Sequence, residues 1–558
     1  MMKIFQNILF PVAIIAVVAG GCKKYDNPPP IFEELETIET IQRKVLVISI
    51  DGVTGSELKT IAPPAIEELR KTGKYSYNLL RGAVANDVAS WASMVTGVSY
   101  SKHSIKNDDF LPSPKENSHE APAVYRNVLD YVLQYKSVKT AIVSPWANLR
   151  NYLRVADFNP IVNTDLAVKD SALNILNTQS QLGTIFVNFK DVQTAGENGG
   201  FLAANVNYKN AILKADEYVG NIVAAVKARK TFANEDWLIV VTTNHGGSSA
   251  NPQPGFLIAS QKNIKSEELK KSGFNTIGFN NVSINATVVD DPSGLYDAAT
   301  KDFTVQMQVK FNVNTYYVGF LGKSTPAVNG QTGWFWFQDY GGYWNTSFGG
   351  TANGNGTGRT QIAGGLVFDG NWHTLTMTVK RVDASTRTVS TYTDGNLNST
   401  GNISTRNIAT NEKFFVGYKQ FSGGTGLDFK SADLQYFNVA LDAVTIKNNI
   451  ALKNITQHPN YSNLVGFWRM DEGADAVFGN SAPVGAPMML NGPFSWTSFG
   501  TDVPQSMTPD PNAAGKSIIV APSSVTALTL YWMNISILPE FGIDGNPFLN
   551  QFEIEFLK

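Results

Sequence analysis

The stretch KVLVISIDG at residues 44–52 decides the fold of the first folded part of the chain. Its apolar, mostly β-branched run is typical of a strand buried on both faces of a parallel sheet. The run ends at Asp51 and Gly52, and ligand-binding residues of open α/β sheets gather at the carboxyl ends of strands. We therefore expect an α/β domain with Asp51 at its functional edge.

Strand-like and helix-like segments alternate after this stretch. Strand patterns recur at residues 140–143, 183–187 and 236–241, and helix-like stretches occupy residues 65–71 and 210–216. This alternation predicts a sheet with helices on both faces.

Length and composition set limits on the rest of the molecule. A chain of 558 residues, 43% hydrophobic and 16% charged, predicts several globular domains. The formal net charge is -2 and no long block of Lys or Arg occurs, so we exclude DNA and RNA as partners.

The N-terminus has the layout of a secretory signal. An apolar run at residues 8–19 follows Lys3 and leads into Gly20-Gly21-Cys22, which resembles a lipobox. We expect a signal peptide at residues 1–21 and a lipidated tether at residues 22–43, with Cys22 anchoring the protein to a membrane. The following Lys23-Lys24 resembles the pattern of outer-membrane delivery.

Four segments of the first domain fit one family together. They are Asp51-Gly52, the Ala62-Pro63-Pro64 turn, Met94-Val95-Thr96-Gly97 with His103, and Thr242-Thr243-Asn244-His245-Gly246-Gly247. In this order and spacing they resemble the type I phosphodiesterase/nucleotide pyrophosphatase branch of the alkaline phosphatase superfamily. The resemblance implies an alkaline-phosphatase-like α/β domain, which we place at residues 44–280.

The resemblance also implies two metal ions, usually zinc, that activate a Thr or Ser nucleophile. Asp51 matches the first aspartate of the family, but Asp87 stands where the nucleophile belongs. A carboxylate cannot become a metal-bound alkoxide. Ser90 and Ser93 carry hydroxyls, but they lie further along the following helix.

The remaining ligand positions are also changed. Gln193 replaces an aspartate, Glu197 replaces a histidine, and Asn244 replaces an aspartate next to the retained His245. Asp191 is also acidic, but it lies two residues before the family's aspartate position, which Gln193 occupies. It is therefore a candidate for a displaced ligand. Because neutral amides are poor zinc ligands, the two-zinc site cannot be assembled in the family's way.

Two interpretations of these residues remain open. In the first, the retained residues are leftovers that local hydrogen bonds satisfy. In the second, oxygen donors hold one calcium or magnesium ion, and two zinc ions are expected only if the domain is active. The candidate metal residues are Asp51, Asp87, Glu197, Asn244 and His245.

From about Val288 the sequence changes to short alternating runs rich in Thr, Asn, Gly and aromatic residues. Residues 302–311 alternate as a strand of an antiparallel sheet does. Residues 370–379 and 391–395 indicate two further strands, and this pair resembles a laminin-G/concanavalin-like sandwich. We therefore expect an all-β sandwich at residues 285–455 and a small β-rich module at residues 456–558.

An aromatic strand at residues 333–340 is the candidate ligand surface of the sandwich. Aromatic residues stand at both odd and even positions of this strand, so they point to both of its faces. Those on one face can enter the core, and those on the other face need a partner. Packing against a neighbouring strand or domain is one interpretation. The other is a carbohydrate-stacking platform made by Trp334, Trp336 and Tyr340.

Three functions follow from these patterns. The leading hypothesis is an outer-membrane lipoprotein with an inactive phosphoesterase-like domain and a sandwich that binds a glycan or a protein. The second is an active metal-dependent phosphodiesterase or phosphatase with a rearranged site. The third is an accessory subunit of an outer-membrane complex.

Overall fold

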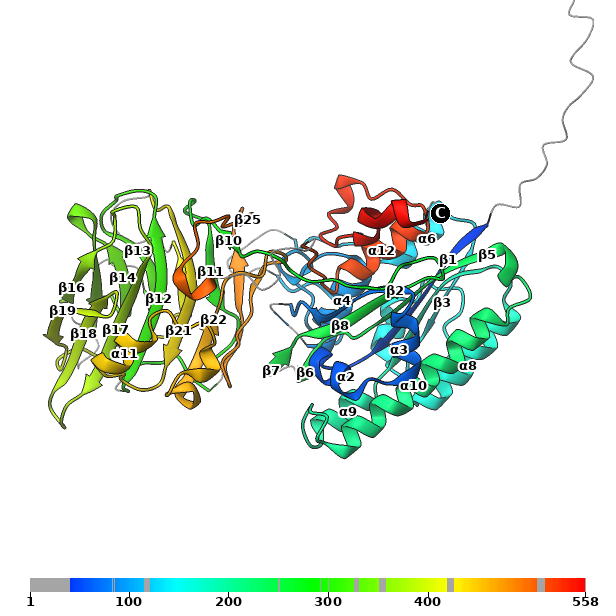
Figure 1. The fold of residues 1–558 in the computed structure, drawn as a ribbon, viewed down its shortest axis with the longest axis horizontal. Helices are drawn as coiled ribbons and strands as arrows, with labels where there is room; N and C mark the ends of the chain where they lie inside the picture. Colours follow the sequence, from blue (N-terminus) through cyan, green and yellow to red (C-terminus); the bar gives the residue numbers. More distant parts are fainter. Residues whose placement is uncertain are drawn as a thin grey trace, which may run out of the picture.

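The structure is a computed structural model that describes residues 41–556, apart from 83, 85, 115–120, 249–250, 292, 300, 326–330, 351–357, 419–425 and 509–516. Figure 1 shows two domains side by side along the long axis, an α/β domain and a domain of β-sheets. The expected signal peptide, Cys22 and most of the tether lie outside the described residues.

A seven-stranded mixed sheet forms the centre of the first domain, with β1 parallel to both of its neighbours. The sheet becomes antiparallel at β8, which pairs with β5 on one side and with β2 on the other. Its strands, in spatial order, are β3 (Lys139–Val143), β4 (Leu182–Phe189), β1 (Gln42–Ile50), β5 (Glu235–Thr242), β8 (Gly255–Ser260), β2 (Gly73–Leu79) and β9 (Glu267–Glu268).

Helices cover both faces of this sheet, as the alternation predicted. Along β1, Val45 and Val47 enter one hydrophobic core, while Leu46 and Ile48 enter the other, because successive strand residues point to opposite faces. The first core contains residues of α4 (Asp87–Thr96), α6 (Val128–Tyr135), α7 (Ala147–Tyr152) and α12 (Ser524–Trp532). The second contains residues of α2 (Gly55–Ile61), α3 (Pro64–Arg70), α8 (Asp165–Thr178), α9 (Asp191–Glu197) and α10 (Val206–Lys227).

Shorter elements connect these layers. The four-residue helix α5 (Tyr100–His103) follows α4, the 3-10 turn η1 (Phe232–Asn234) leads into β5, and β6 (Gly246–Ser248) pairs with β7 (Asn251–Gln253). None of the helices in the described part of the chain is both long and apolar enough to cross a bilayer.

Two antiparallel sheets pack over one core in the second domain, which confirms the expected sandwich. The eight-stranded sheet contains β16 (Thr360–Leu366), β15 (Tyr343–Phe348), β14 (Gly333–Gln338), β13 (Val318–Ser324), β20 (Phe415–Gly417), β11 (Asn285–Val288), β24 (Met488–Asn491) and β23 (Val477–Phe478). The six-stranded sheet contains β19 (Asn396–Asn402), β18 (Arg387–Thr393), β17 (His373–Arg381), β12 (Phe303–Phe311), β21 (Phe429–Phe437) and β22 (Leu464–Trp468). Helix α11 (Ala443–Asn449) follows β21.

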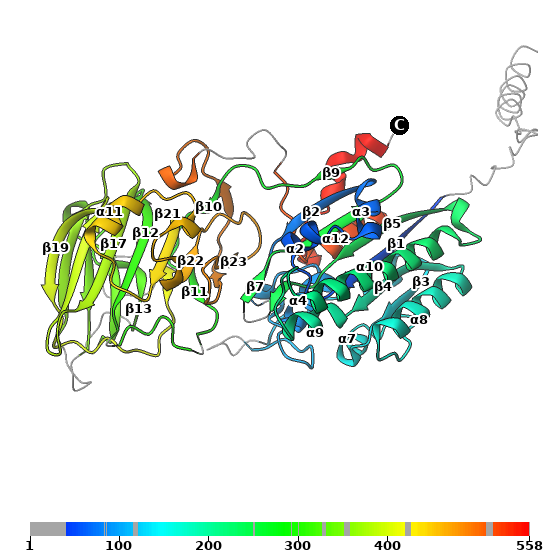
Figure 2. The same ribbon diagram turned by 60° about the horizontal axis from the view of Figure 1, so that its bottom comes forward.

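The C-terminal part differs from the expected β-rich module at residues 456–558. Strands β22, β23 and β24 complete the two sheets of the sandwich, and β25 (Trp496–Ser498) pairs with β10 (Asn275–Ile277). The chain then returns to the first domain, where α12 and the 3-10 segment η7 (Phe548–Phe556) pack (Figure 2). The reason is burial: α12 is buried on nearly all sides, and such a helix belongs inside a core.

Candidate functional site

Asp51 lies at the carboxyl end of β1, where the sequence places it, and its side chain is completely buried. Both of its carboxylate oxygens accept hydrogen bonds, Oδ1 from Ser49 Oγ at 2.7 Å and Oδ2 from Trp91 Nε1 at 3.1 Å. Burial raises the pKa of Asp51 above its ordinary value, because a buried carboxylate loses its hydration.

Gly52 allows a helix to approach this strand end closely. Its φ of 81° lies in the left-handed region, and a Cβ at this position would lie 2.8 Å from Gln193 Cα. Only glycine accepts both conditions without strain. Gly52 therefore lets Gln193, on α9, pack directly against the end of β1.

Asp87 begins α4 and makes four polar contacts. Its Oδ1 accepts from Asn244 Nδ2 at 2.8 Å and lies 3.0 Å from His245 Nε2. Its Oδ2 accepts from Lys190 Nζ at 2.7 Å and from Gln193 Nε2 at 3.1 Å. Burial alone would raise the pKa of Asp87, but the His245 hydrogen bond and the Lys190 charge outweigh it and hold that pKa below its ordinary value.

Asn244 has a defined orientation in this cluster. Its Oδ1 accepts from the backbone N–H groups of His245 at 2.7 Å and of Gly52 at 3.2 Å. The amide nitrogen is therefore the group that faces Asp87. An aspartate at this position would present a second negative charge to Asp87, and the asparagine presents a donor instead.

Lys190 is the site residue that sequence reasoning missed. It follows β4 directly, and its Nζ lies 2.7 Å from Asp87 Oδ2 and 3.8 Å from Asp51 Oδ2. The ammonium also lies 4.7 Å from the centre of the Trp146 ring, a cation–π contact. Burial would lower the pKa of Lys190, but the two carboxylates outweigh it and raise that pKa.

A signal for Lys190 was present in the sequence. The residue follows a strand that ends at the same sheet edge as Asp51, and two carboxylates that lack metal ligands around them need a counter-charge. Charge balance at this edge, considered together with the ligand positions, points to the lysine.

Other candidate residues lie at the margin of the site. Glu197, at the end of α9, is exposed and contacts the amide of Gln193 at 3.1 Å. Asp191 is exposed, and its backbone N–H donates to Asp165. Ser93 Oγ bonds to His103 Nε2 at 2.9 Å. The structure therefore gathers Asp51, Asp87, Asn244 and His245 and leaves Glu197 outside.

The residues present do not fit the metal pair that the family implies. The Lys190 ammonium lies between the two carboxylates, and amide nitrogens of Gln193 and Asn244 face Asp87 where ligand atoms would be needed. In the part of the chain that the structure describes, no group of three or more His, Cys, Asp or Glu side chains is arranged to hold a metal ion.

The side chains of the aromatic strand β14 could either pack against a neighbouring strand or domain or form a carbohydrate-stacking platform. Trp334 and Trp336 are completely buried between the sheets, and the Trp336 ring lies 4.9 Å from that of Trp344. The expectation that Trp334 and Trp336 stack on a glycan is therefore wrong, because their parity faces the core. Tyr340 lies beyond the end of the strand, with 77% of its surface exposed.

Comparisons with known proteins agree with the geometry of the first domain. Residues 45–291 match the model of the family described as type I phosphodiesterase/nucleotide pyrophosphatase. No curated protein matches the chain. The match covers less than half of the chain: it spans the α/β domain up to β11, the first strand of the β-sandwich that follows.

Similar solved structures have low identity and partial coverage. Murine ectonucleotide pyrophosphatase/phosphodiesterase 5, an inactive variant in complex with AMP, is 17% identical, with 37% of this chain and 57% of that chain covered and a TM-score of 0.31. A 2-O GAG sulfatase is 11% identical, with coverages of 40% and 65% and a TM-score of 0.32. A candidate carbohydrate-binding protein from Bacteroides ovatus is 12% identical, with coverages of 46% and 76% and a TM-score of 0.31. The chain thus spans 57% of the length of the murine protein.

Proposed function

We propose that this protein is a lipid-anchored outer-membrane binding protein whose phosphodiesterase-type domain does not hydrolyse phosphate esters. The observation that carries the proposal is the position of the Lys190 ammonium, 2.7 Å from Asp87 and 3.8 Å from Asp51. An ammonium between two carboxylates supplies the positive charge that these groups need. A divalent cation would have to displace it.

The nucleophile position supports the same proposal. Asp87 occupies that position. Its two carboxylate oxygens contact four side-chain nitrogens, one each from Lys190, Gln193, Asn244 and His245. An attacking oxygen needs a free lone pair directed at the phosphorus atom. In this arrangement the carboxylate serves as the acceptor at the centre of a hydrogen-bonded cluster.

Membrane anchoring rests on the N-terminal sequence. The apolar run at residues 8–19, the small residues before Cys22 and the Lys pair after it support export, lipidation and outer-membrane delivery. Radiolabelled palmitate should label the wild-type protein, and the Cys22→Ser variant should lose both the label and its membrane association. A labelled Cys22→Ser variant would contradict lipidation at this residue.

The direct test of the non-hydrolytic role is an activity assay. Purified protein is incubated with bis(4-nitrophenyl) phosphate and with 4-nitrophenyl phosphate, each with added zinc, magnesium or calcium. We expect the wild type and Asp51→Ala to release nitrophenol at the same background rate. Zinc-dependent turnover that disappears in Asp51→Ala would overturn the proposal and favour the active hydrolase.

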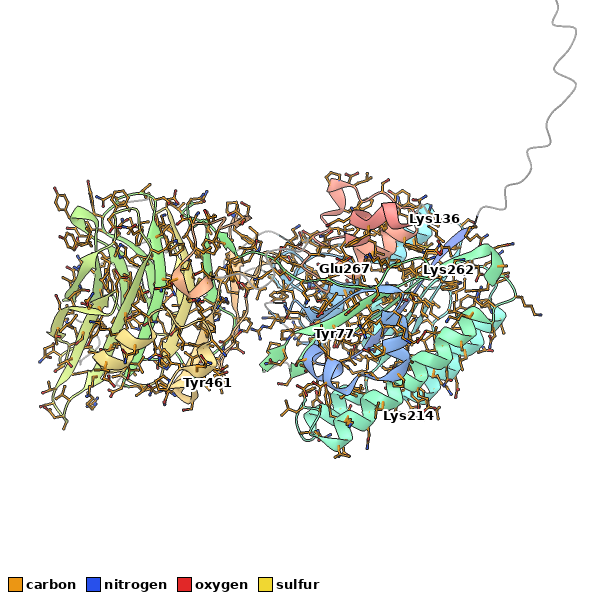
Figure 3. All side chains as sticks on the ribbon, in the orientation of Figure 1. Tyr77, Lys136, Lys214, Lys262, Glu267 and Tyr461 are labelled. Atoms are coloured by element: carbon orange, nitrogen blue, oxygen red, sulfur yellow. The ribbon has the colours of Figure 1, made fainter. Side chains whose placement is uncertain are left out.

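A second lysine variant, Lys214→Met, is the control for Lys190→Met, which removes the ammonium between Asp51 and Asp87. Lys214 lies on the outer side of α10 and pairs only with Glu217 among the ion pairs of the described residues (Figure 3). Lys214→Met removes the same charge far from the Asp51–Asp87 cluster. Its rate should equal that of the wild type in every assay.

A further inference from the structure

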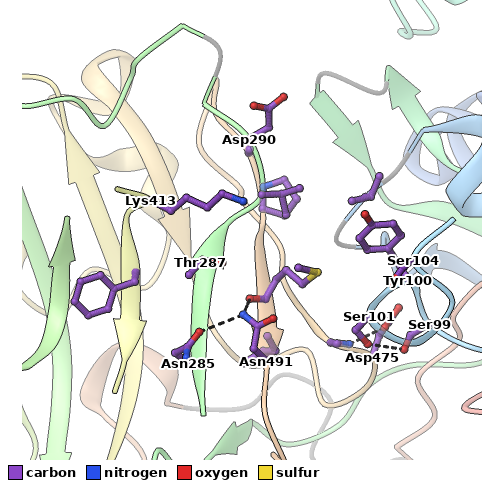
Figure 4. A pocket seen from close by; sticks show the side chains of 18 of the residues that line it. Ser99, Tyr100, Ser101, Ser104, Asn285, Thr287, Asp290, Lys413, Asp475 and Asn491 are labelled. Atoms are coloured by element: carbon purple, nitrogen blue, oxygen red, sulfur yellow. Dashed lines mark hydrogen bonds between the residues drawn. The ribbon is translucent and has the colours of Figure 1, made fainter. Parts of the chain in front are cut away.

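A large cleft lies between the two domains. Its volume is about 2160 Å³, and both domains contribute side chains to its walls. Figure 4 shows residues of α5 and the turn after it on one side, and residues of β11 and β24 on the other. Clefts between domains are common places for ligand sites.

The sandwich wall of the cleft is the outer face of the eight-stranded sheet. On β11, Ala286 and Val288 are buried in the core, so Asn285 and Thr287 point outward. Asn285 pairs in register with Asn491 and Thr287 with Met489, and all four are half-buried. Asn491 Nδ2 donates to Asn285 Oδ1 at 3.2 Å.

The opposite wall is held rigidly by the C-terminal segment. Ser99, the residue before α5, donates to Asp544 Oδ2 through its backbone N–H at 2.8 Å and through its hydroxyl at 2.9 Å. At the other end of α5, His103 Nε2 bonds to Ser93 Oγ at 2.9 Å. Tyr100 is therefore presented to the cleft on a helix that is fixed at both ends.

The lining combines aromatic rings with uncharged polar groups. Tyr100, Phe494 and Trp496 are half-buried there, and Trp496 Nε1 donates to the carbonyl of Asp475 at 2.8 Å. Hydroxyls and amides, such as those of Ser101 and Asn491, line the same cleft. Flat rings pack against the C–H faces of sugars, and amides and hydroxyls pair with sugar hydroxyls.

The charges of the lining select against anionic ligands. Three lysines and five acidic residues line the cleft, so the described lining is net negative when all of them are ionised. Lys102, one of the three lysines, is already paired with Asp544. Phosphate and sulfate groups are repelled by such a surface, whereas an uncharged ligand is not.

We propose that this cleft binds an uncharged oligosaccharide, which contacts both domains at once. The inference deepens the proposed binding role and rests on it. The proposed ligand surface is the outer face of β11 and β24 opposite α5, and not the strand that carries the buried Trp334 and Trp336. The domains then act together, because neither wall alone encloses the ligand.

The test is calorimetric titration of the full chain with maltohexaose, cellohexaose, xylohexaose and mannohexaose. We expect wild-type protein to bind at least one of them and Thr287→Trp to weaken that binding about tenfold or more, because the indole fills the cleft from an outward-facing position. Ser390→Trp is the matched control, since Ser390 is an outward position on β18 of the other sheet. It should bind as the wild type does.

The results of the titrations distinguish a wrong ligand class from a wrong location of the site. Binding to none of the four hexasaccharides overturns the ligand class, while the activity assay still decides on hydrolysis separately. Binding that survives Thr287→Trp but is lost in Tyr340→Ala overturns the location, because it places the ligand at the exposed tyrosine. If Thr287→Trp fails to fold by circular dichroism, Asn491→Ala combined with Tyr100→Ala makes the same test by removing contacts.

Discussion

The strand-end site of the first domain and the outer face of β11 in the second both carry polar side chains, but the first is largely buried and the second lines a cleft. In the first site, neighbouring side chains donate to both oxygens of Asp51 and to both oxygens of Asp87, so the two carboxylates are fully engaged. Thr287 instead faces a cleft of about 2160 Å³, beside Asn285, which accepts one hydrogen bond from Asn491. A site at the place usual for a fold is therefore available for chemistry only where neighbouring side chains do not already engage its carboxylates.

The largest expected effect concerns the core of the sandwich. Trp336→Ala should lower the free energy of unfolding by about 4 kcal/mol, because it removes a fully buried ring that packs against Trp344. Tyr340→Ala, at an exposed position, should change it by less than about 0.5 kcal/mol. Urea denaturation followed by tryptophan fluorescence measures both, and equal losses would contradict the assignment of Trp336 to the core.

Removal of the Lys190 charge should have the next largest effect. Lys190→Met leaves Asp51 and Asp87 without their counter-charge, so the free energy of unfolding should fall by about 3 kcal/mol. Lys214→Met should lower the free energy of unfolding by less than about 0.5 kcal/mol, because the ion pair of Lys214 is exposed. A loss as small in Lys190→Met as in Lys214→Met would show that the ammonium does not hold the cluster together.

A pH effect at the sandwich side of the domain interface should be smaller. Burial and the neighbouring Asp471 raise the pKa of Glu472 to about 7, while its Oε1 accepts from Gly479 N at 2.7 Å. The folded protein therefore holds a proton that the unfolded chain releases near pH 4. The contribution of Glu472 to the free energy of unfolding is full below that pH and is lost as pH rises through about 7.

The check is a pair of stability profiles between about pH 4 and pH 8. Glu472→Gln should remove this part of the slope, because an amide does not titrate. The slope of the wild type and that of the variant would coincide if Glu472 were ionised in the folded protein throughout this range.

Much of the first domain could be predicted from the sequence. The alternation of strands and helices has a local period, and the carboxyl ends of β1 and β5 bring Asp51 and Asn244 together in any sheet of this topology. Lys190 was missed because a lysine is not a metal ligand, and its role depends on a charge balance across three segments. The expected ligand Glu197 lies outside because α9 turns it to the surface.

The sandwich was predicted as a class but not in its details. Trp334 and Phe335 have opposite parity and are both buried, so the pattern alone does not say which parity faces the other sheet. The path of residues 456–558 depends on pairing between distant strands and on the return of α12 to the first domain. Such contacts are set by tertiary packing rather than by local sequence.

Anomalous diffraction at the zinc edge, from crystals of the wild-type protein soaked in zinc, tests whether the Lys190 ammonium occupies the place of a metal ion. We expect no anomalous peak between Asp51 and Asp87, with continuous density for the Lys190 side chain between the two carboxylates. A zinc peak at that position, with Lys190 turned away, would contradict it.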